Sequence, residues 1–407
     1  MISFKLWLEN EESHESIDME IPMPDDILIL NDLFKKHNKK LYAVGGVVRD
    51  HLISHFHYAG QGSGPKDVDL TTDATPDEIT EILQSPDAIR NEIKVLPKGA
   101  AFGVISAVID GKEYEIATFR EEYYDPIAGD GRRPDGWKTS TADKDASRRD
   151  LTMNALFYDI DNKKIIDYNT INGKGQGIDD IKNLVARPVG NPYERFREDK
   201  LRVLRLVRFF CRFNSGSIIN ELDKDTLGAI DKYKRLEGIS AERIVSEFIS
   251  GFKSAVSKKS YFKNYEELDL FPAVLPGLKV NIEGMENVKS FPASLSFLLR
   301  DNQEPMEVRK KLSALKYTND ISDKVELMLK LLRMERYEII PLIKRKEVLI
   351  GSKDDILDLA VLTKNELIHK FANYQQQTHS KDFMHLKGKE IALAMDRKEK
   401  ELFTSGH

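Results

Sequence analysis

The strongest constraint on the fold is a change of hydrophobic pattern near residue 170 of this 407-residue chain. Helical segments such as 25–37 alternate with short apolar runs before that point, whereas nearly every segment from residue 177 onward has helical periodicity. The apolar runs predict β-strands at residues 41–44, 68–70, 103–109, 114–119 and 165–168. Alternating elements followed by helices alone predict an α+β protein, with a mixed α/β head and an all-helical remainder.

Composition excludes several classes of protein. Hydrophobic residues make up 41% and charged residues 32% of the chain, as in globular proteins, and no apolar run approaches the ~20 residues of a membrane-spanning helix. A single cysteine, Cys211, excludes an intramolecular disulfide and a cysteine-based zinc site. The N-terminal residues lack the pattern of a secretory signal, so we expect a cytoplasmic protein with no membrane contact.

The net charge of −5 conceals an uneven distribution. Residues 1–30 contain eight acidic residues and one lysine, which gives −7 and leaves +2 for the rest of the chain. Residues 194–213 contain seven arginines and lysines against three acids. A local basic stripe on a balanced protein favours a phosphate-bearing partner, although a solvated helix face would also explain it.

The apolar run 41–44 ends in a pair of glycines, Gly45 and Gly46, and a helix is expected to follow. Glycines at the end of a strand let backbone N–H groups approach a phosphate closely, and the helix adds the positive end of its dipole. Arg49 lies one turn into that helix and supplies a charge-assisted contact. Turns of this kind are also common as plain structure, and the spacing is neither a Rossmann fingerprint nor a Walker loop.

Asp67 and Asp69 flank the start of the next expected strand. Residues i and i+2 of a strand project from one face, so the two carboxylates are expected side by side. A cation between them relieves their repulsion, and Mg²⁺ prefers oxygen ligands that it shares with substrate phosphates. Glu115, in the expected strand 114–119, is a candidate third carboxylate. Surface strands contain such pairs by chance too, but a position soon after a phosphate-binding turn favours a metal site.

Three further motifs follow in order, at residues 148–155 (RRDLTMNA), 198–209 (EDKLRVLRLVRF) and 239–244 (ISAERI). With the glycine pair and the two aspartates, they make the chain resemble the class II nucleotidyltransferases of the polymerase-β-like superfamily over about residues 40–250. This group comprises the CCA-adding tRNA nucleotidyltransferases and the related bacterial poly(A) polymerases. The resemblance implies a polymerase-β-like nucleotidyltransferase head, a mixed sheet with helices, followed by an all-helical neck, body and tail.

The resemblance also implies a reaction and its partners. The reaction is template-independent transfer of CMP and AMP from CTP and ATP to the 3′ end of tRNA, with release of pyrophosphate. Asp67 and Asp69 would bind two Mg²⁺ ions, and Glu115 would complete the catalytic carboxylates. The expected partners are tRNA, CTP and ATP, and no protein partner is expected.

The same resemblance assigns residues to each part of the nucleotide. Arg149 and Asp150 would contact the ribose, and Asp199 with Arg202 would read the base. Arg205 and Arg208 would serve the triphosphate or support the helix. The complete set of expected nucleotide-binding residues is Gly45, Gly46, Arg49, Arg149, Asp150, Asp199, Arg202, Arg205 and Arg208.

Related activities stay open at this point. A poly(A) polymerase would use the same head, although the modest net charge and the lack of a strongly basic C-terminal extension favour the CCA enzyme. Enzymes that add only CC or only A also remain, and the Arg132-Arg133 pair in the loop 123–137 argues against pure CC addition. A non-catalytic RNA-binding relative would be expected to lose the aspartate pair, and a small-molecule nucleotidyltransferase would not need the helical half.

Helical spacing places Arg195, Asp199 and Arg202 on one face of a single helix, where an ordinary Asp199–Arg202 ion pair is the plainer alternative. The histidines within 51–57 are expected in a solvent-exposed loop rather than at a metal. Five parts of the chain are expected: an acidic N-terminal extension (1–30), a catalytic head (31–175), a neck with the base motif (176–265), a body (266–335) and a tail that contacts tRNA (336–407).

Overall fold

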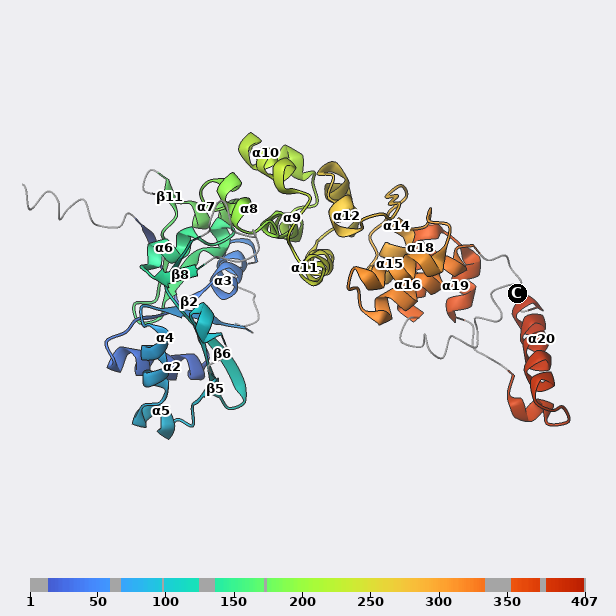
Figure 1. Cartoon of the computed structure of the whole chain (residues 1–407), viewed down its shortest axis with the longest axis horizontal. Helices are drawn as coiled ribbons and strands as arrows, with labels where there is room; N and C mark the ends of the chain where they lie inside the picture. Colours follow the sequence, from blue (N-terminus) through green and yellow to red (C-terminus); the bar gives the residue numbers. More distant parts are fainter. Residues whose placement is uncertain are drawn as a thin grey trace, which may run out of the picture. The chain divides into compact units, whose positions relative to one another are not determined.

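The computed structural model describes residues 14–58, 67–96, 99–123, 136–171, 174–333, 353–373 and 378–405. Two compact units divide the chain, one comprising Met1–Phe210 with Asn220–Ile239 and the other Cys211–Ile219 with Ser240–His407. The β-strands lie in the first unit, whereas the described part of the second consists of helices and their connections (Figure 1). This distribution confirms the α+β class expected from the sequence.

A mixed eight-stranded sheet lies at the centre of the first unit. Neighbouring strands pair antiparallel, except for β3 and β6, which run parallel. Val44, the last residue of β2, pairs with Asp69, the first residue of β3. The turn that leaves β2 therefore lies beside the carboxylate that opens β3. In order across the sheet the strands are β1 (Glu15–Asp18), β10 (Lys164–Asp167), β9 (Leu156–Asp159), β2 (Leu41–Val44), β3 (Asp69–Thr72), β6 (Lys112–Thr118), β5 (Val104–Ile109) and β4 (Lys94–Leu96).

Two short ribbons and a set of helices complete the first unit. The ribbons pair β7 (Arg120–Tyr123) with β8 (Gly136–Thr139), and β11 (Thr170–Ile171) with β12 (Lys174–Gly175). The helices are α2 (Asp25–Lys36), α3 (Gly46–His57), α4 (Pro76–Leu83), α5 (Pro86–Arg90), α6 (Ala142–Ser147), α7 (Gln176–Asn183), α8 (Pro192–Glu198), α9 (Arg202–Phe213) and α10 (Lys224–Tyr233). The last three residues of α9, from Cys211, belong to the second unit. Helices α2 and α3 both contact β2, and α7 packs against α3 and β10.

An aromatic cluster on one face of the sheet holds helix α6 in place. Tyr42, Phe119 and Phe157 contribute rings whose centroids lie 5.8–6.1 Å apart, and Ala146 of α6 packs against them. All four side chains are buried. Burial of this apolar surface stabilises the docking of α6, by about 25 cal/mol for each Å² removed from water. The position of α6 in turn decides where the arginines that follow it lie.

The second unit has an aromatic core of its own. The rings of Phe248, Phe252, Tyr261, Phe262 and Tyr265 contact one another between α11 and α12. The Tyr261 hydroxyl donates to the Phe248 carbonyl oxygen at 2.8 Å, so burial leaves no unpaired phenol there. The helices are α11 (Ala241–Ser254), α12 (Lys258–Glu267), α13 (Phe271–Val274), α14 (Phe291–Leu298), α15 (Pro305–Ala314), α16 (Asn319–Leu331), α18 (Lys353–Thr363), α19 (Glu366–Asn373) and α20 (Lys389–Ser405).

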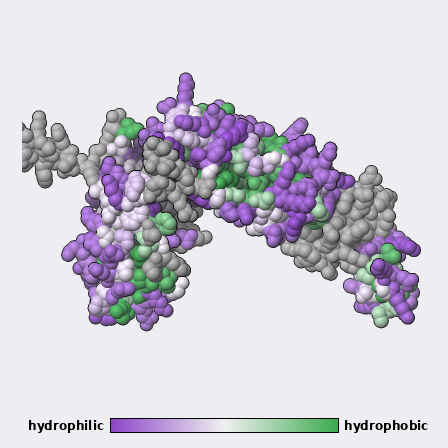
Figure 2. Space-filling model, in the orientation of Figure 1, coloured by the Kyte–Doolittle hydropathy of each residue, from purple (hydrophilic) through white to green (hydrophobic). Residues whose placement is uncertain are grey.

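The surface seen in Figure 2 is mainly hydrophilic, with smaller hydrophobic areas between, as the 32% of charged residues leads one to expect. Among the described helices, none combines the length and the apolar composition that crossing a bilayer requires. Side chains cap several of the helix starts in the first unit. Thr75 and Glu78 cap each other's backbone N–H groups at α4, and Asn191 caps α8 ahead of Pro192.

The structure confirms most of the elements expected from the sequence and corrects others. The strands at 41–44, 68–70, 103–109, 114–119 and 165–168 and the helix at 25–37 are confirmed within two residues. The expected loop containing three histidines is wrong, because residues 51–57 continue helix α3. The expected boundary at residue 30 falls inside α2, and β1 from the acidic extension pairs with β10 of the sheet. Arg132-Arg133 lies outside the described residues, as does part of the expected tail.

Candidate active site

The turn between β2 and α3 has a backbone conformation that requires glycine. Gly45 has φ +70° and ψ −119°, a region that L side chains rarely adopt. A Cβ added there would lie 3.7 Å from Nη1 of Arg149 and 3.8 Å from Oδ2 of Asp69. The turn therefore brings the N-terminus of α3 next to both a cation and a carboxylate. Backbone N–H groups at such an N-terminus favour an anion.

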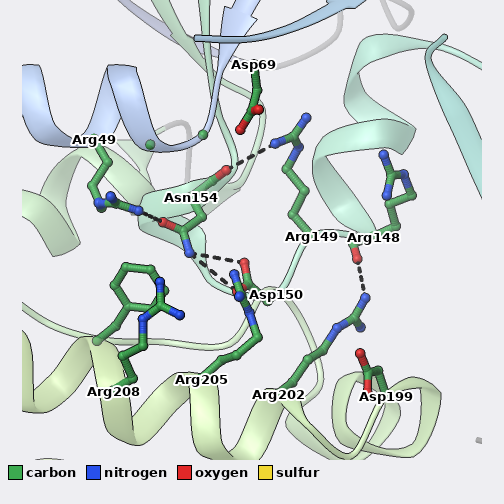
Figure 3. A pocket seen from close by; sticks show the side chains of 13 residues that line it. Arg49, Asp69, Arg148, Arg149, Asp150, Asn154, Asp199, Arg202, Arg205 and Arg208 are labelled. Carbon is green, nitrogen blue, oxygen red and sulfur yellow. Dashed lines mark hydrogen bonds and ion pairs between the residues drawn. The ribbon is translucent and has the colours of Figure 1, made fainter. Parts of the chain in front are cut away.

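A cavity of about 430 Å³ opens at this turn, within the first unit. Every residue that the sequence analysis assigned to nucleotide binding lines it, together with Asp69 and three residues that the assignment omitted: Arg148, Asn154 and Phe209. Figure 3 shows Arg202, Arg205 and Arg208 projecting from α9 toward the side chains opposite. The lining contains six arginines but only three aspartates, so the cavity favours a strongly anionic ligand.

A chain of hydrogen bonds crosses the cavity (Figure 3). Nη1 of Arg49 donates to Oδ1 of Asn154 at 2.6 Å, and Nδ2 of Asn154 donates to Oδ1 of Asp150 at 3.2 Å. Nε of Arg205 donates to Oδ2 of Asp150 at 2.6 Å. Burial alone would raise the pKa of Asp150, but the charge and hydrogen bond of Arg205 outweigh it and lower the pKa to about 2. Asp150 is therefore a carboxylate at any physiological pH.

Asp145 on α6 orients the next two arginines. Its side chain is fully buried, and its two oxygens accept from Nη2 of Arg148 at 2.6 Å and from Nη2 of Arg149 at 3.0 Å. These two cations lower the pKa of Asp145 despite its burial. Arg149 also donates to the Asn154 carbonyl oxygen at 3.4 Å, which aims its guanidinium toward Gly45 and Asp69. Of the three residues that the sequence assignment missed, Arg148 and Asn154 lie inside the RRDLTMNA motif, and Phe209 is the last residue of the EDKLRVLRLVRF motif.

The expected single helix through the base motif is wrong. Helix α8 ends at Glu198, Asp199 is extended at φ −148° and ψ 104°, and α9 begins only at Arg202. Oδ1 of Asp199 accepts from the Leu201 N–H at 3.1 Å, which is an Asx turn. The Asp199–Arg202 helical ion pair is therefore not the explanation for this motif, although both residues line the cavity.

Glu198 is the acid that holds Arg202. Its Oε2 accepts from Nη1 of Arg202 at 2.6 Å, and its Oε1 accepts from Nη2 of Arg195 at 2.6 Å. Burial of the Glu198 carboxyl raises its pKa, because the two arginines only partly offset the desolvation. Nη1 and Nη2 of Arg202 also donate to the carbonyl oxygens of Arg195 and Arg148. The guanidinium is thus fixed from three sides.

The three carboxylates that the sequence analysis assigned to catalysis line a second hollow, of about 520 Å³, beside the arginine-rich cavity. Asp67, Asp69 and Glu115 all line it, and Asp69 lines both cavities. Asp67 precedes β3 rather than belonging to it, so the strand argument for its orientation is wrong. In the part of the chain that the structure describes, no three acidic, histidine or cysteine side chains come close enough to hold a metal by themselves. The exposed carboxylates of Asp67, Asp69 and Glu115 suit a hard divalent cation that takes its other ligands from a bound substrate.

The three histidines of α3 do not form a metal site within the described residues. A ring nitrogen of His57, Nε2, lies 2.9 Å from the Ile181 carbonyl oxygen of α7 and helps to join the two helices. Burial, with the neighbouring His55, lowers the pKa of His51. The contact of His57 therefore helps to hold α3, which presents the glycine turn, against α7.

Comparison with known proteins supplies the family context. The Poly A polymerase head domain family matches residues 41–187. The CCA-adding enzyme of Staphylococcus saprophyticus is 31% identical over 304 residues, which span 73% of this chain but 66% of that enzyme. The CCA-adding enzyme of Staphylococcus epidermidis is 30% identical over 401 residues, 93% of this chain and 88% of the relative.

Solved structures agree on the fold. The Bacillus stearothermophilus CCA-adding enzyme in complex with CTP matches with a TM-score of 0.63 at 23% identity, over 93% of this chain and 92% of that one. The Thermotoga maritima CCA-adding enzyme complexed with tRNA matches with a TM-score of 0.65 at 17% identity, over 95% of both chains. At these identities the likeness shows a shared fold.

Proposed function

The chain belongs to the CCA-adding enzyme family of tRNA nucleotidyltransferases, and we propose that its two adjoining cavities add CMP and AMP, from CTP and ATP, to the 3′ end of tRNA. The observation that carries the proposal is the meeting of the two cavities at Asp69. One cavity is rich in arginine and suits a nucleoside triphosphate, and the other is acidic and suits a metal-assisted reaction. A single, buried cysteine, Cys211, fits a reducing cytoplasm as the place of the reaction.

The triphosphate is assigned to the glycine turn. The N-terminus of α3 at Gly45 and Gly46 offers backbone N–H groups, and Arg49, Arg205 and Arg208 line the same cavity. Bidentate guanidinium groups match the oxygens of phosphate in geometry and charge. These groups orient the α-phosphate toward Asp69, and they stabilise the charge on the departing pyrophosphate.

The ribose is assigned to Asp150 with Arg149. The Asp150 carboxylate is held ionised by Arg205, so it accepts a hydrogen bond from a ribose hydroxyl. Arg149 is aimed at the same region by Asp145. A 2′-hydroxyl is what separates a ribonucleotide from a deoxyribonucleotide, so this contact supports selection of NTP over dNTP.

The base is assigned to Asp199 and Arg202. A guanidinium has five N–H bonds, and three of those of Arg202 are engaged by Glu198 and by the carbonyl oxygens of Arg195 and Arg148. The others can donate to a ring nitrogen while Asp199 accepts from an exocyclic amine. Cytosine and adenine both present that amine beside an acceptor nitrogen, whereas uracil and guanine present the reverse pattern. One pair of side chains therefore accepts C and A and rejects U and G.

The metal is assigned to the acidic hollow. Enzymes of this family normally use divalent metal ions, and we propose Mg²⁺, with Asp67 and Asp69 as its ligands and Glu115 beside them. Bound there, Mg²⁺ would lower the pKa of the RNA 3′-hydroxyl and neutralise phosphate charge. Asp69 stands between the arginine-rich cavity and the hollow, so the RNA 3′ end is assigned to the side of Asp67 and Glu115.

Incubation with tRNA that lacks its CCA end, followed by sequencing of the 3′ termini, tests the proposal. CTP and ATP together are expected to yield termini in CCA, and the Asp69→Asn variant is the matched inactive control. Long runs of A would instead identify a poly(A) polymerase, an alternative that is consistent with the match to the Poly A polymerase head domain. Termini that stop at CC, or that gain A only on CC-ended tRNA, would identify a partial enzyme. Unchanged termini would refute the proposal.

A further inference from the structure

One aromatic ring lies among three of the cavity's arginines. The Cζ atom of Arg49 lies 4.8 Å from the centroid of the Phe209 ring, that of Arg208 lies 5.1 Å away, and that of Arg205 lies 5.8 Å away. Phe209 is only 2% exposed and lines the arginine-rich cavity. Arg205 and Arg208 share α9 with the ring, whereas Arg49 comes from α3. The ring thus joins cations from two elements.

Three guanidinium groups around one ring carry like charges, of which Arg49 pairs with Asp50 and Arg205 with Asp150. The face of an aromatic ring carries negative electrostatic potential, and a cation within about 6 Å of the ring centroid is attracted to it. All three arginines of this cluster meet that distance. Aliphatic side chains of similar size would fill the same volume but would offer no such attraction.

Two of these arginines also donate to acidic and amide side chains. Arg49 donates from Nε to Asp50 at 2.8 Å and from Nη1 to Asn154 at 2.6 Å, and Arg205 donates to Asp150 at 2.6 Å. These partners anchor the guanidinium groups from different directions. The Phe209 ring is a contact that Arg49, Arg205 and Arg208 share.

We propose that Phe209 is a positioning residue that gathers Arg49, Arg205 and Arg208 into a preformed site for the pyrophosphate portion of the nucleotide. The inference rests on the proposed function, because it assigns that portion of the substrate to these arginines. It predicts a selective effect. Loss of the ring weakens binding of anything that carries the pyrophosphate group, and it leaves binding of the base and ribose unchanged.

The first test compares Phe209→Leu with Phe210→Leu. Both phenylalanines are 2% exposed on α9, but Phe210 does not line the cavity, so it controls for loss of a buried ring. In Phe209→Leu we expect the KM for CTP and for ATP to rise about tenfold, equivalent to ~1.4 kcal/mol, with kcat within about threefold of the wild-type value. We expect inhibition by inorganic pyrophosphate to weaken by a similar factor and inhibition by cytidine to stay unchanged. Phe210→Leu should leave both inhibition constants unchanged.

The second test keeps the shape of the ring and removes its electrostatic attraction. Incorporation of 3,4,5-trifluorophenylalanine at position 209 weakens the negative face with little change of size. We expect the same selective loss of pyrophosphate inhibition, in a protein whose thermal unfolding matches that of the wild type. Equal weakening of pyrophosphate and cytidine, or no weakening by the fluorinated ring, would overturn the inference. Failure of the wild-type protein to extend tRNA would instead refute the proposed function, and pyrophosphate binding measured by calorimetry would still test the role of Phe209.

Discussion

Replacing Asp150 by asparagine tests whether the hydrogen-bonded chain across the cavity stabilises the head as well as orienting the nucleotide. Burial would raise the pKa of Asp150, but Arg205 and the donors Asn154 and Leu151 lower it from 3.8 to about 2. At about 1.4 kcal/mol per pKa unit, this shift corresponds to about 2 kcal/mol of folding free energy. Because the folded pKa lies below the unfolded one, the stabilisation is complete well above pH 4 and is lost as the pH falls through about 2.

Urea unfolding followed by tryptophan fluorescence measures this effect in the relevant part of the chain, because both tryptophans, Trp7 and Trp137, precede residue 210. We expect Asp150→Asn to lose about 2 kcal/mol at pH 7 and at pH 5, and about half as much at pH 3. Asp179→Asn is the matched control, since its ion pair with Lys182 is half exposed and is worth at most about 0.5 kcal/mol. A loss in Asp150→Asn no larger than the control, or one that grows as the pH falls, would refute the reasoning.

Four further expectations follow from the site and the fold. Asp67→Ala and Asp69→Ala should each abolish nucleotide addition. Activity of either variant within about tenfold of wild type, or ~1.4 kcal/mol on the barrier, would contradict the metal assignment. Asp199→Ala and Arg202→Ala should incorporate much less CMP and AMP from CTP and ATP and should discriminate less against UTP and GTP. Unchanged selectivity in incorporation assays with all four nucleotides would show that the pair has only a structural role. Affinity for tRNA should fall with salt, with a log–log slope of about −0.9 for each duplex phosphate contact, and a salt-independent affinity in filter binding would argue against RNA. Burial outweighs the backbone hydrogen bonds of Asp167 and raises its pKa to about 6, so the charged form destabilises the fold. In urea titrations, Asp167→Asn should therefore gain stability relative to wild type, by up to about 3 kcal/mol, as the pH rises from 4 to 7. A difference in stability that stays constant with pH would contradict this.

The features that short-range chemistry decides were predictable from the sequence. The strand at 41–44 and the helix after it follow from a compact apolar run and a glycine pair, and the positive φ of Gly45 is the conformation that such a pair permits. The neighbourhood of Gly45 and Asp69 was not predictable in this way. It depends on the antiparallel pairing of β2 with β3, a choice of sheet order that joins residues more than twenty positions apart. The resemblance to a known family, rather than periodicity, brought those residues together.

Asp67 and the histidines show where local patterns mislead. The i, i+2 argument treated Asp67 as part of the strand expected at 68–70, but β3 begins at Asp69, where its pairing with β2 starts. The histidines within 51–57 resembled loop residues, since their polarity hides the helical register of α3. Contacts of α3 with β2 and α7 stabilise the helix there, so tertiary packing outweighs local polarity. Both errors arise from contacts between segments that are distant in sequence.

The break between α8 and α9 is the feature on which the proposed reading of the base depends. In a continuous helix, Asp199 and Arg202 at i and i+3 would lie within reach of each other and would pair, for only about 0.2–0.5 kcal/mol. The break instead gives the two neighbouring acids different tasks. Glu198, the last residue of α8, neutralises and fixes Arg202, while Asp199 is extended and lines the cavity. A helical pattern of apolar residues runs through the break, so periodicity alone cannot reveal it. The local signal is the aspartate itself, whose side chain accepts the N–H two residues on and starts α9 anew. The proposed contact of Asp199 and Arg202 with one nucleotide edge therefore depends on an interruption of the helix that the periodic pattern conceals.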